Sequence, residues 1–133
     1  MKKLTIKKIG GTDERLYPLV GPLAMNAEVI KQNGGYPFKT SDKFTWYIAL
    51  DGKAVVGLLP VEQKAVGIEV ANYYLAADDP VLLKRMLAVV TSDFSGLGNF
   101  VFVARTAHAK ACWDNNFKVE KKWVKYTRMI KKL

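Results

Sequence analysis

The chain has 133 residues, of which 50% are hydrophobic and 25% are charged, a composition typical of one domain with its own core. Its single cysteine excludes an internal disulfide, and no apolar run approaches the ~20 residues that cross a bilayer. Residues 1–5 lack the apolar stretch of a signal peptide, so we expect a cytoplasmic protein without membrane contact. Most of the formal net charge of +9 lies in residues 100–133, which indicates an anionic partner or a solvated, lysine-rich sheet edge.

A strand and two helices are predicted at the N-terminal end. Residues 4–9 combine apolar side chains with lysines, as in a short strand that has one wet face. Apolar residues then recur at helical spacing, and Gly21-Pro22 is a combination that breaks or kinks a helix. We therefore expect helices over residues 13–20 and 22–33.

A hairpin follows these helices. Residues 44–50 are rich in aromatic and β-branched side chains, which favours a strand. Asp51-Gly52 is a strong signal for a tight turn, so residues 53–61 are expected to return antiparallel to the first strand. Gly57 within the return strand indicates a bulge or a close backbone approach.

A strand–helix–strand unit occupies the middle of the chain. Residues 65–77 form a long, mostly apolar stretch that is expected to be a single strand at the centre of the sheet. Asp78 or Asp79 caps the next helix, and Pro80 lies in its first turn. Residues 100–104 form the following buried strand. A helix between two such strands predicts that the strands are parallel neighbours.

The C-terminal segment completes one domain over residues 1–133. A short helix at 107–115 leads through Asn116-Phe117 into what is expected to be one long, basic strand. The whole order predicts an α/β (α+β) fold. Its central sheet is mixed and mostly antiparallel, with one parallel strand pair, and helices flank both faces.

This order resembles the GNAT superfamily of acyl-CoA-dependent N-acyltransferases over nearly the whole chain. Residues 69–75 look like the family's fourth strand, and Asn116-Phe117 lies where the family has a glycine-phenylalanine turn. Met129 lies where the family's last strand often carries a methionine. The resemblance implies a splayed pair of parallel strands that admits the pantetheine arm of acetyl-CoA. It also implies a helix N-terminus that receives the pyrophosphate.

The segment that would bind the cofactor departs from the family, because it has no glycine-rich pyrophosphate loop. Asp78 and Asp79 stand in the anion's place and would repel it, and Pro80 has no amide to donate. Basic side chains one helical turn further on would partly compensate. The resemblance implies these cofactor contacts: Tyr74, Leu75, Ala76, Ala77, Val81, Leu82, Lys84 and Arg85.

Two residues are candidates for catalysis. Glu69 would be the general base that deprotonates an amine, and the alternative is an outward-facing strand residue paired with a lysine. Cys112 lies five residues before Phe117, where many family members place a tyrosine as general acid. Its alternative role is a small buried side chain of an amphipathic helix. The only histidine, His108, is expected to be a partly exposed capping or surface residue, and no ligand spacing indicates a metal.

The leading hypothesis is therefore transfer of an acyl group, most simply acetyl, from acetyl-CoA to the amine of a small molecule or a protein. The alternative is a degenerate GNAT-fold binding module that contacts nucleic acid through its basic C-terminal strand, with aromatic rings stacking on bases. Trp123 and Tyr126 are the aromatic residues among these basic ones: Lys118, Lys121, Lys122, Lys125, Arg128, Lys131 and Lys132.

Overall fold

The computed structural model describes residues 4–133. Across these residues the strands are β1 (Leu4–Gly10), β2 (Phe44–Asp51), β3 (Ala54–Lys64), β4 (Gly67–Val70), β5 (Tyr74–Leu75), β6 (Asn99–Arg105), β7 (Lys118–Lys122) and β8 (Tyr126–Lys132). The helices are α1 (Leu16–Ala24), α2 (Ala27–Gln32), α3 (Pro80–Asp93) and α4 (Ala109–Trp113), with 3-10 turns η1 (Ala76–Asp78) and η2 (Thr106–His108).

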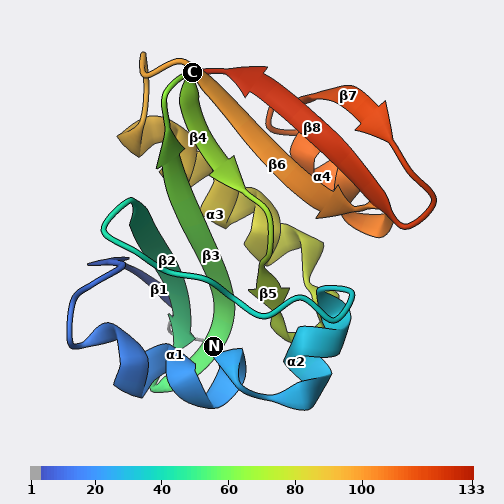
Figure 1. The fold of residues 1–133 in the computed structure, drawn as a ribbon. Coiled ribbons are helices and arrows are strands. Elements are labelled where there is room, and N and C mark those ends of the chain that lie inside the picture. The colour runs from blue at the N-terminus through green and yellow to red at the C-terminus, as the bar shows by residue number, and fades with distance from the viewer. Residues whose placement is uncertain (1–3) are drawn as a thin grey trace.

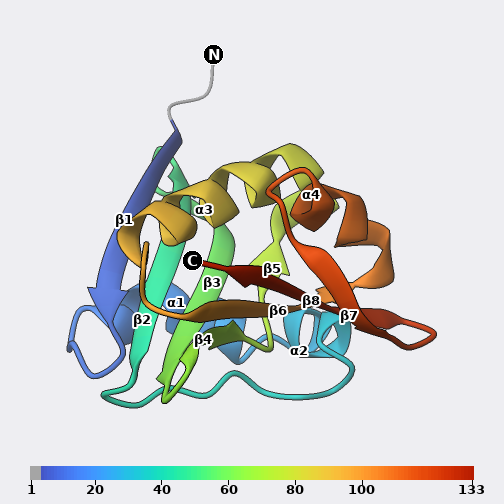
Figure 2. The ribbon, with the colours of Figure 1, turned by 90° about the horizontal axis from the view of Figure 1, so that it is seen from above.

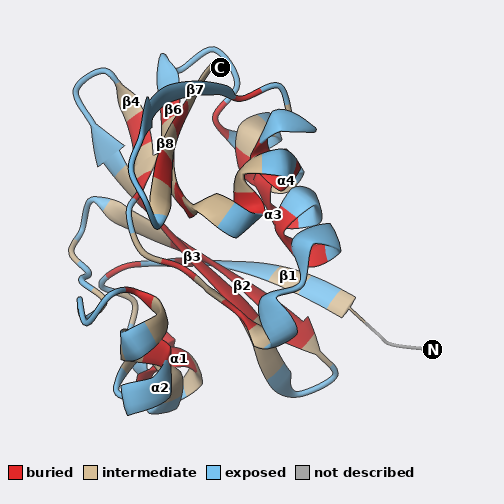
Figure 3. Ribbon diagram, turned by 90° about the vertical axis from the view of Figure 1, so that its right-hand side faces the viewer, coloured by how far each residue is buried: buried red, intermediate tan, exposed pale blue. Residues whose placement is uncertain are grey.

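One mixed sheet joins these strands in the order β1-β2-β3-β4-β6-β8-β7, and the short β5 pairs with β3 (Figure 1). β4 and β6 are parallel, and the other paired strands are antiparallel. α3 and α4 cover one face of the sheet, and α1 and α2 lie on the other (Figures 2 and 3). The predicted α/β (α+β) fold, with one parallel strand pair and helices on both faces, is confirmed.

Each face of the sheet carries its own apolar core, because side chains alternate between the two faces of a strand. Under α3, the aromatic rings of Phe100, Phe102 and Phe117 pack edge to face or tilted, with centroids 5.0 to 6.5 Å apart. Under α1, Trp46 and Ile48 of β2 are almost completely buried in the second core. The buried residues are coloured red in Figure 3.

The parallel pair is short. β4 pairs with β6 from Gly67 opposite Asn99 to Val70 opposite Phe102. Beyond Val70 the chain leaves β6, and it next pairs with β3 at β5. The prediction of one continuous strand over residues 65–77 is therefore wrong, because residues 71–73 pair with neither neighbour. This divergence of two parallel strands positions the candidate site.

The start of α3 agrees with the prediction of an aspartate cap followed by Pro80 in the first turn. The Asp79 carboxylate accepts hydrogen bonds from the amides of Val81 at 3.0 Å and Leu82 at 3.3 Å, and Pro80 is the first helical residue. The register of the β2–β3 hairpin shifts beside Gly57, because Ala49 pairs with Gly57 but Leu50 pairs with Val55, which leaves Val56 as the extra residue. The predicted bulge is therefore present next to Gly57. A close backbone approach, the alternative, is not seen, because a Cβ at Gly57 would meet the Met86 sulfur at 2.9 Å and other side-chain atoms.

The helix boundary expected at Gly21-Pro22 is wrong. α1 continues through Pro22 to Ala24, and α2 begins only after Asn26. The Asn26 side chain caps α2 by accepting a hydrogen bond from the Glu28 amide at 2.8 Å. The break between the helices therefore falls at Asn26, where a cap satisfies the free amides at the start of α2. Pro22 costs α1 one hydrogen bond but does not end it.

The single long C-terminal strand is also a wrong prediction. β7 and β8 form an antiparallel hairpin, and the turn between them consists of residues 123–125. β7 is the edge of the sheet and all five of its residues are exposed. The lysines of β7 therefore lie on a solvated edge strand, in agreement with the more conservative interpretation of the charge.

Candidate functional site

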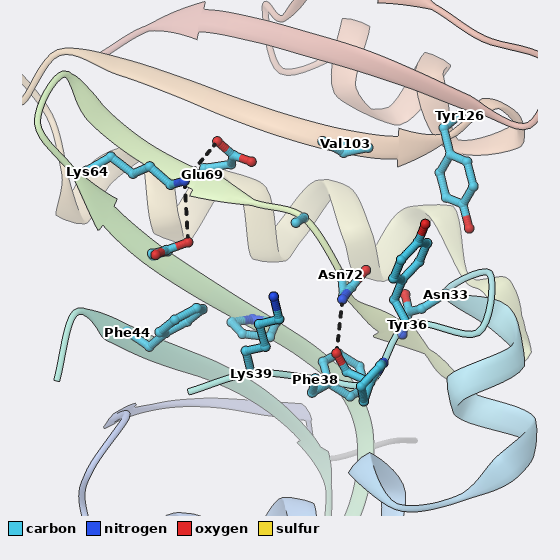
Figure 4. A pocket seen from close by; sticks show the side chains of 14 residues that line it. Asn33, Tyr36, Phe38, Lys39, Phe44, Lys64, Glu69, Asn72, Val103 and Tyr126 are labelled. Atoms are coloured by element: carbon cyan, nitrogen blue, oxygen red, sulfur yellow. Dashed lines mark hydrogen bonds and ion pairs between the residues drawn. The ribbon is translucent and has the colours of Figure 1, made fainter. Parts of the chain in front are cut away.

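A cavity of about 440 Å³ opens between the α2–β2 connection and the strands β3, β4, β6 and β8 (Figure 4). This volume lies within the usual range for small-molecule sites. The α2–β2 connection supplies an aromatic wall, and the strands supply apolar residues from the floor of the sheet. The main apolar lining residues are Tyr36, Phe38, Phe44, Pro60, Val103 and Tyr126.

Charged groups converge on the same cavity. Glu69 of β4 and Glu62 of β3 are directly opposite each other across the strand pair. The Lys64 ammonium lies 3.7 Å from one carboxylate oxygen of each. One cation thus serves two carboxylates, which leaves negative charge available to attract a protonated amine. Lys39 also lines the cavity, from the α2–β2 connection (Figure 4).

Tyr73 lies in the unpaired stretch between β4 and β5, and its ring is buried beside β6, with its centroid 4.8 Å from that of Phe102. The Tyr73 hydroxyl accepts a hydrogen bond from the Arg105 amide at 2.9 Å. It also lies 2.6 Å from Nδ1 of His108 and forms a hydrogen bond with it. We assign the proton of this bond to the hydroxyl, because Nε2 of the same ring faces the Asp78 carboxylate, where the proton of a neutral imidazole is stabilised. One hydroxyl group therefore links the end of β6 to the turn that follows it, in place of the missing strand partner.

Burial keeps both members of this pair neutral at pH 7. It raises the pKa of Tyr73 to about 12. Burial first, and then the nearby Arg105 charge, lower the pKa of His108 from its ordinary 6.5. A neutral imidazole that accepts at Nδ1 carries its proton on Nε2. That nitrogen faces the Asp78 carboxylate at 3.7 Å.

The segment before α3 is held by the chain's own carboxylates. Ala77 and Asp78 both adopt the left-handed region, with φ of 57° and 51°, which is unfavourable for residues other than glycine. Asp78 forms an ion pair with Arg105 at 2.7 Å. Because Asp79 already binds the first amides of α3, this helix N-terminus has fewer free donors for a phosphate.

The residues predicted to bind a cofactor lie in this segment and on both sides of it. Leu75 and Leu82 are core residues, whereas Val81 is 71% exposed. Lys84 forms an ion pair with Asp114 at 3.3 Å, and Arg85 is exposed on α3. The other members of the set, at the strand end and in η1, are Tyr74, Ala76 and Ala77.

The two predicted catalytic residues are not brought together. Glu69 lines the cavity, as a general base would. It also forms an ion pair with Lys64, which is the pairing expected if Glu69 were only a strand residue paired with a lysine. Cys112 is completely buried in the core under α3 and α4, and burial raises its pKa to about 12. Its role as general acid stays a prediction, and its position favours the packing alternative.

Sequence reasoning missed the cluster of Tyr73, Arg105 and His108. The expectation of a partly exposed His108 is wrong, because its side chain is only 4% exposed and is bonded to Tyr73. The hydrogen-bond partners are 35 and 32 positions apart in the chain. No local spacing could have indicated them.

Within residues 4–133, no helix is long and apolar enough to span a bilayer. The same part of the chain has no group of three or more His, Cys, Asp or Glu residues that could hold a metal ion.

No protein-family model and no curated protein sequence matches this chain, but solved structures do. The chain superposes on ElaA of Escherichia coli with a TM-score of 0.69, at 10% identity, covering 97% of this chain and 99% of that one. The ribosomal-protein-S18-alanine N-acetyltransferase of Escherichia coli gives a TM-score of 0.69 at 9% identity, with 96% and 91% covered. The PaiA N-acetyltransferase of Thermoplasma acidophilum, solved with coenzyme A, gives 0.64 at 14% identity, with 98% and 99% covered.

At such low identities these similarities concern the fold alone. The chain has the fold of the GNAT acetyltransferases, over nearly its full length. The resemblance seen in the order of elements along the sequence is thereby confirmed as a resemblance of structure.

Proposed function

We propose that this protein transfers an acyl group from acyl-CoA, with acetyl-CoA as the simplest donor, to an amine bound in the cavity beside Glu69. The observation that carries the proposal is the position of Glu69. Its carboxylate lines the cavity from β4, just before β4 and β6 diverge. The fold shared with N-acetyltransferases supports this assignment by analogy.

Acyl-CoA supplies an activated acyl group as a thioester. Glu69 would hold the acceptor as an ammonium ion and then take its proton, directly or through a water, so that the nitrogen can form the new amide bond. The thiolate that leaves as the carbon–sulfur bond breaks takes up a proton. Cys112 is the donor that the sequence suggests.

The walls of the cavity favour an acceptor whose amine is attached to an apolar body. Tyr36, Phe38 and Phe44 provide ring surfaces for such a body. Lys39 adds a cation on the side of the α2–β2 connection, where an acidic group of the acceptor would be stabilised. Arylalkyl amines and aromatic amino acids are therefore the first acceptors to test.

The test is turnover of acetyl-CoA with a panel of these amines, followed by the appearance of free thiol. Glu69→Gln is expected to lower kcat/KM by at least about 100-fold, the range for loss of a general base. Glu62→Gln is the matched control, because Glu62 shares the same lysine at the same 3.7 Å distance. Its loss should stay below about tenfold. Absence of turnover with every amine, or equal effects of the two variants, would contradict the proposal.

A second candidate function is binding of single-stranded nucleic acid by the β7–β8 hairpin. The specific observation is its tip, where Trp123 is 43% exposed and Val124 is 93% exposed. The Lys121 ammonium lies 5.2 Å from the centre of the Trp123 ring, so one base could stack beside a cation. An oligonucleotide titration tests this directly. Affinity should fall with salt and with Trp123→Ala, and an affinity that neither changes would exclude this function.

A further inference from the structure

Two groups of the β6–η2 corner converge on one carboxylate oxygen. Nη2 of Arg105 lies 2.7 Å from Oδ1 of Asp78, and Nε2 of His108 lies 3.7 Å from the same atom. Arg105 ends β6 and His108 ends η2, whereas Asp78 belongs to η1 before α3. The contact therefore ties two segments that are far apart in the sequence, next to the start of α3.

The two basic residues of this contact, Arg105 and His108, are held in fixed positions. The Arg105 guanidinium lies 5.4 Å from the centre of the Tyr73 ring, and its backbone amide donates to the Tyr73 hydroxyl. His108 is 4% exposed and held at Nδ1 by the same hydroxyl. Arg105 and His108 thus share one buried anchor, so little conformational entropy is lost when they bind an anion.

The carboxylate side has the opposite character. The Asp78 side chain is 59% exposed, compared with 19% for Arg105. Asp78 and Ala77 are consecutive residues in the left-handed region, a conformation that non-glycine residues adopt only at a cost. An exposed acid on a strained turn can leave the contact without disturbing the core.

We propose that Arg105 and His108 form an anion-binding site that the Asp78 carboxylate occupies as an internal ligand, and that a phosphate-bearing ligand enters by displacing it. The guanidinium can bind a phosphate through two parallel hydrogen bonds, and the imidazole can donate a third from Nε2. The exchange replaces one ion pair with another, so no charge is left unpaired at the site.

This assignment moves the expected anion anchor away from the N-terminus of α3. The first amides of α3 are capped by Asp79, and Lys84 on the same helix is paired with Asp114. Among residues 4–133, the ionic partner of Arg105 is Asp78, an acid from a strained, exposed turn. The identification of the ligand as the phosphate part of CoA rests on the proposed function, whereas the site itself does not.

The test is calorimetric titration of inorganic pyrophosphate, and separately of CoA, into the wild-type protein and Asp78→Asn. Asparagine keeps the shape of the side chain and tolerates the left-handed conformation, so the variant is expected to fold. We expect both ligands to bind about tenfold more tightly to Asp78→Asn, since a competing ion pair is removed. Glu14→Gln, the same change of charge at an exposed residue before α1, should leave both affinities unchanged.

Two further variants complete the design. Asp78→Gly removes the acid and the backbone strain together, and should reproduce the gain. Adding Arg105→Gln to Asp78→Asn should abolish it, because the anchor itself is then lost. The inference is overturned if pyrophosphate binds Asp78→Asn and Asp78→Gly no more tightly than the wild type, or if the gain survives without Arg105.

The outcome also separates this inference from the proposed function. Tighter pyrophosphate binding to Asp78→Asn, without CoA binding or turnover in any variant, would keep the anion site and exclude acyl transfer. Turnover by the wild-type protein, with affinities for pyrophosphate and CoA that do not change when Asp78 is substituted, would support acyl transfer. It would exclude the role of Asp78 as an internal ligand of the anion site.

Discussion

Removing the hydroxyl group of Tyr73 tests whether this one group holds the end of β6. In Tyr73→Phe the ring stays, so the core is not emptied, but the Arg105 amide and His108 Nδ1 both lose their partner. A buried polar atom left unpaired costs about 1–3 kcal/mol. The Arg105 amide is only partly buried, and water can replace some of its bond, so we expect a total loss of about 2–4 kcal/mol.

The assay is urea unfolding followed by tryptophan fluorescence, together with the thermal midpoint. For a chain of this length, about 1 kcal/mol corresponds to roughly 3–4 °C, so Tm should fall by about 6–16 °C. Tyr36→Phe is the control, because the Tyr36 side chain is 69% exposed, and it should change stability by less than about 0.5 kcal/mol. A Tyr73→Phe protein within about 0.5 kcal/mol of the wild type would refute the bridging role.

Two further predictions concern the strand pair and the histidine. Gly67→Ala should destabilise the protein by more than about 2 kcal/mol, because φ is 145° there and a Cβ would overlap the Asn99 carbonyl. Gly10→Ala, where nothing lies within 4 Å, is its control, and equal urea midpoints would contradict the prediction. Because the pKa of native His108 is lowered, the unfolded state binds more protons as pH falls below 6.5, so stability should decrease from about pH 7.5 to about pH 5.5. His108→Gln should weaken that decrease, and parallel profiles would show that another group is responsible.

Much of the fold was predictable because its signals are local. Asp79 and Pro80 start α3 by satisfying free amides and fixing φ, and both residues are visible in the sequence. Asp51-Gly52 specifies its turn in the same way. Glu69 could be proposed as a site residue because a strand position and a carboxylate were enough to suggest it. The structure places it at the cavity.

The failures have physical causes of a different kind. The β7–β8 turn at residues 123–125 contains no glycine, proline or asparagine, so nothing in its composition separates it from the strands. The break after Val70 falls at Ala71-Asn72, between two stretches of apolar and aromatic residues that favour a strand, and the chain then pairs with β3 instead of β6. The cluster of Tyr73, Arg105 and His108 depends on contacts across the fold, which no local pattern encodes.

Titration of acetyl-CoA into the wild-type protein, at low and at physiological salt, tests the central claim of acyl transfer most directly. The proposed function predicts saturable binding in the micromolar range that survives physiological salt, because contacts along a pantetheine arm are not screened as charges are. Absence of binding up to millimolar acetyl-CoA, in the wild type and in Asp78→Asn alike, would contradict it. The chain would then have the fold of an acetyltransferase without its donor.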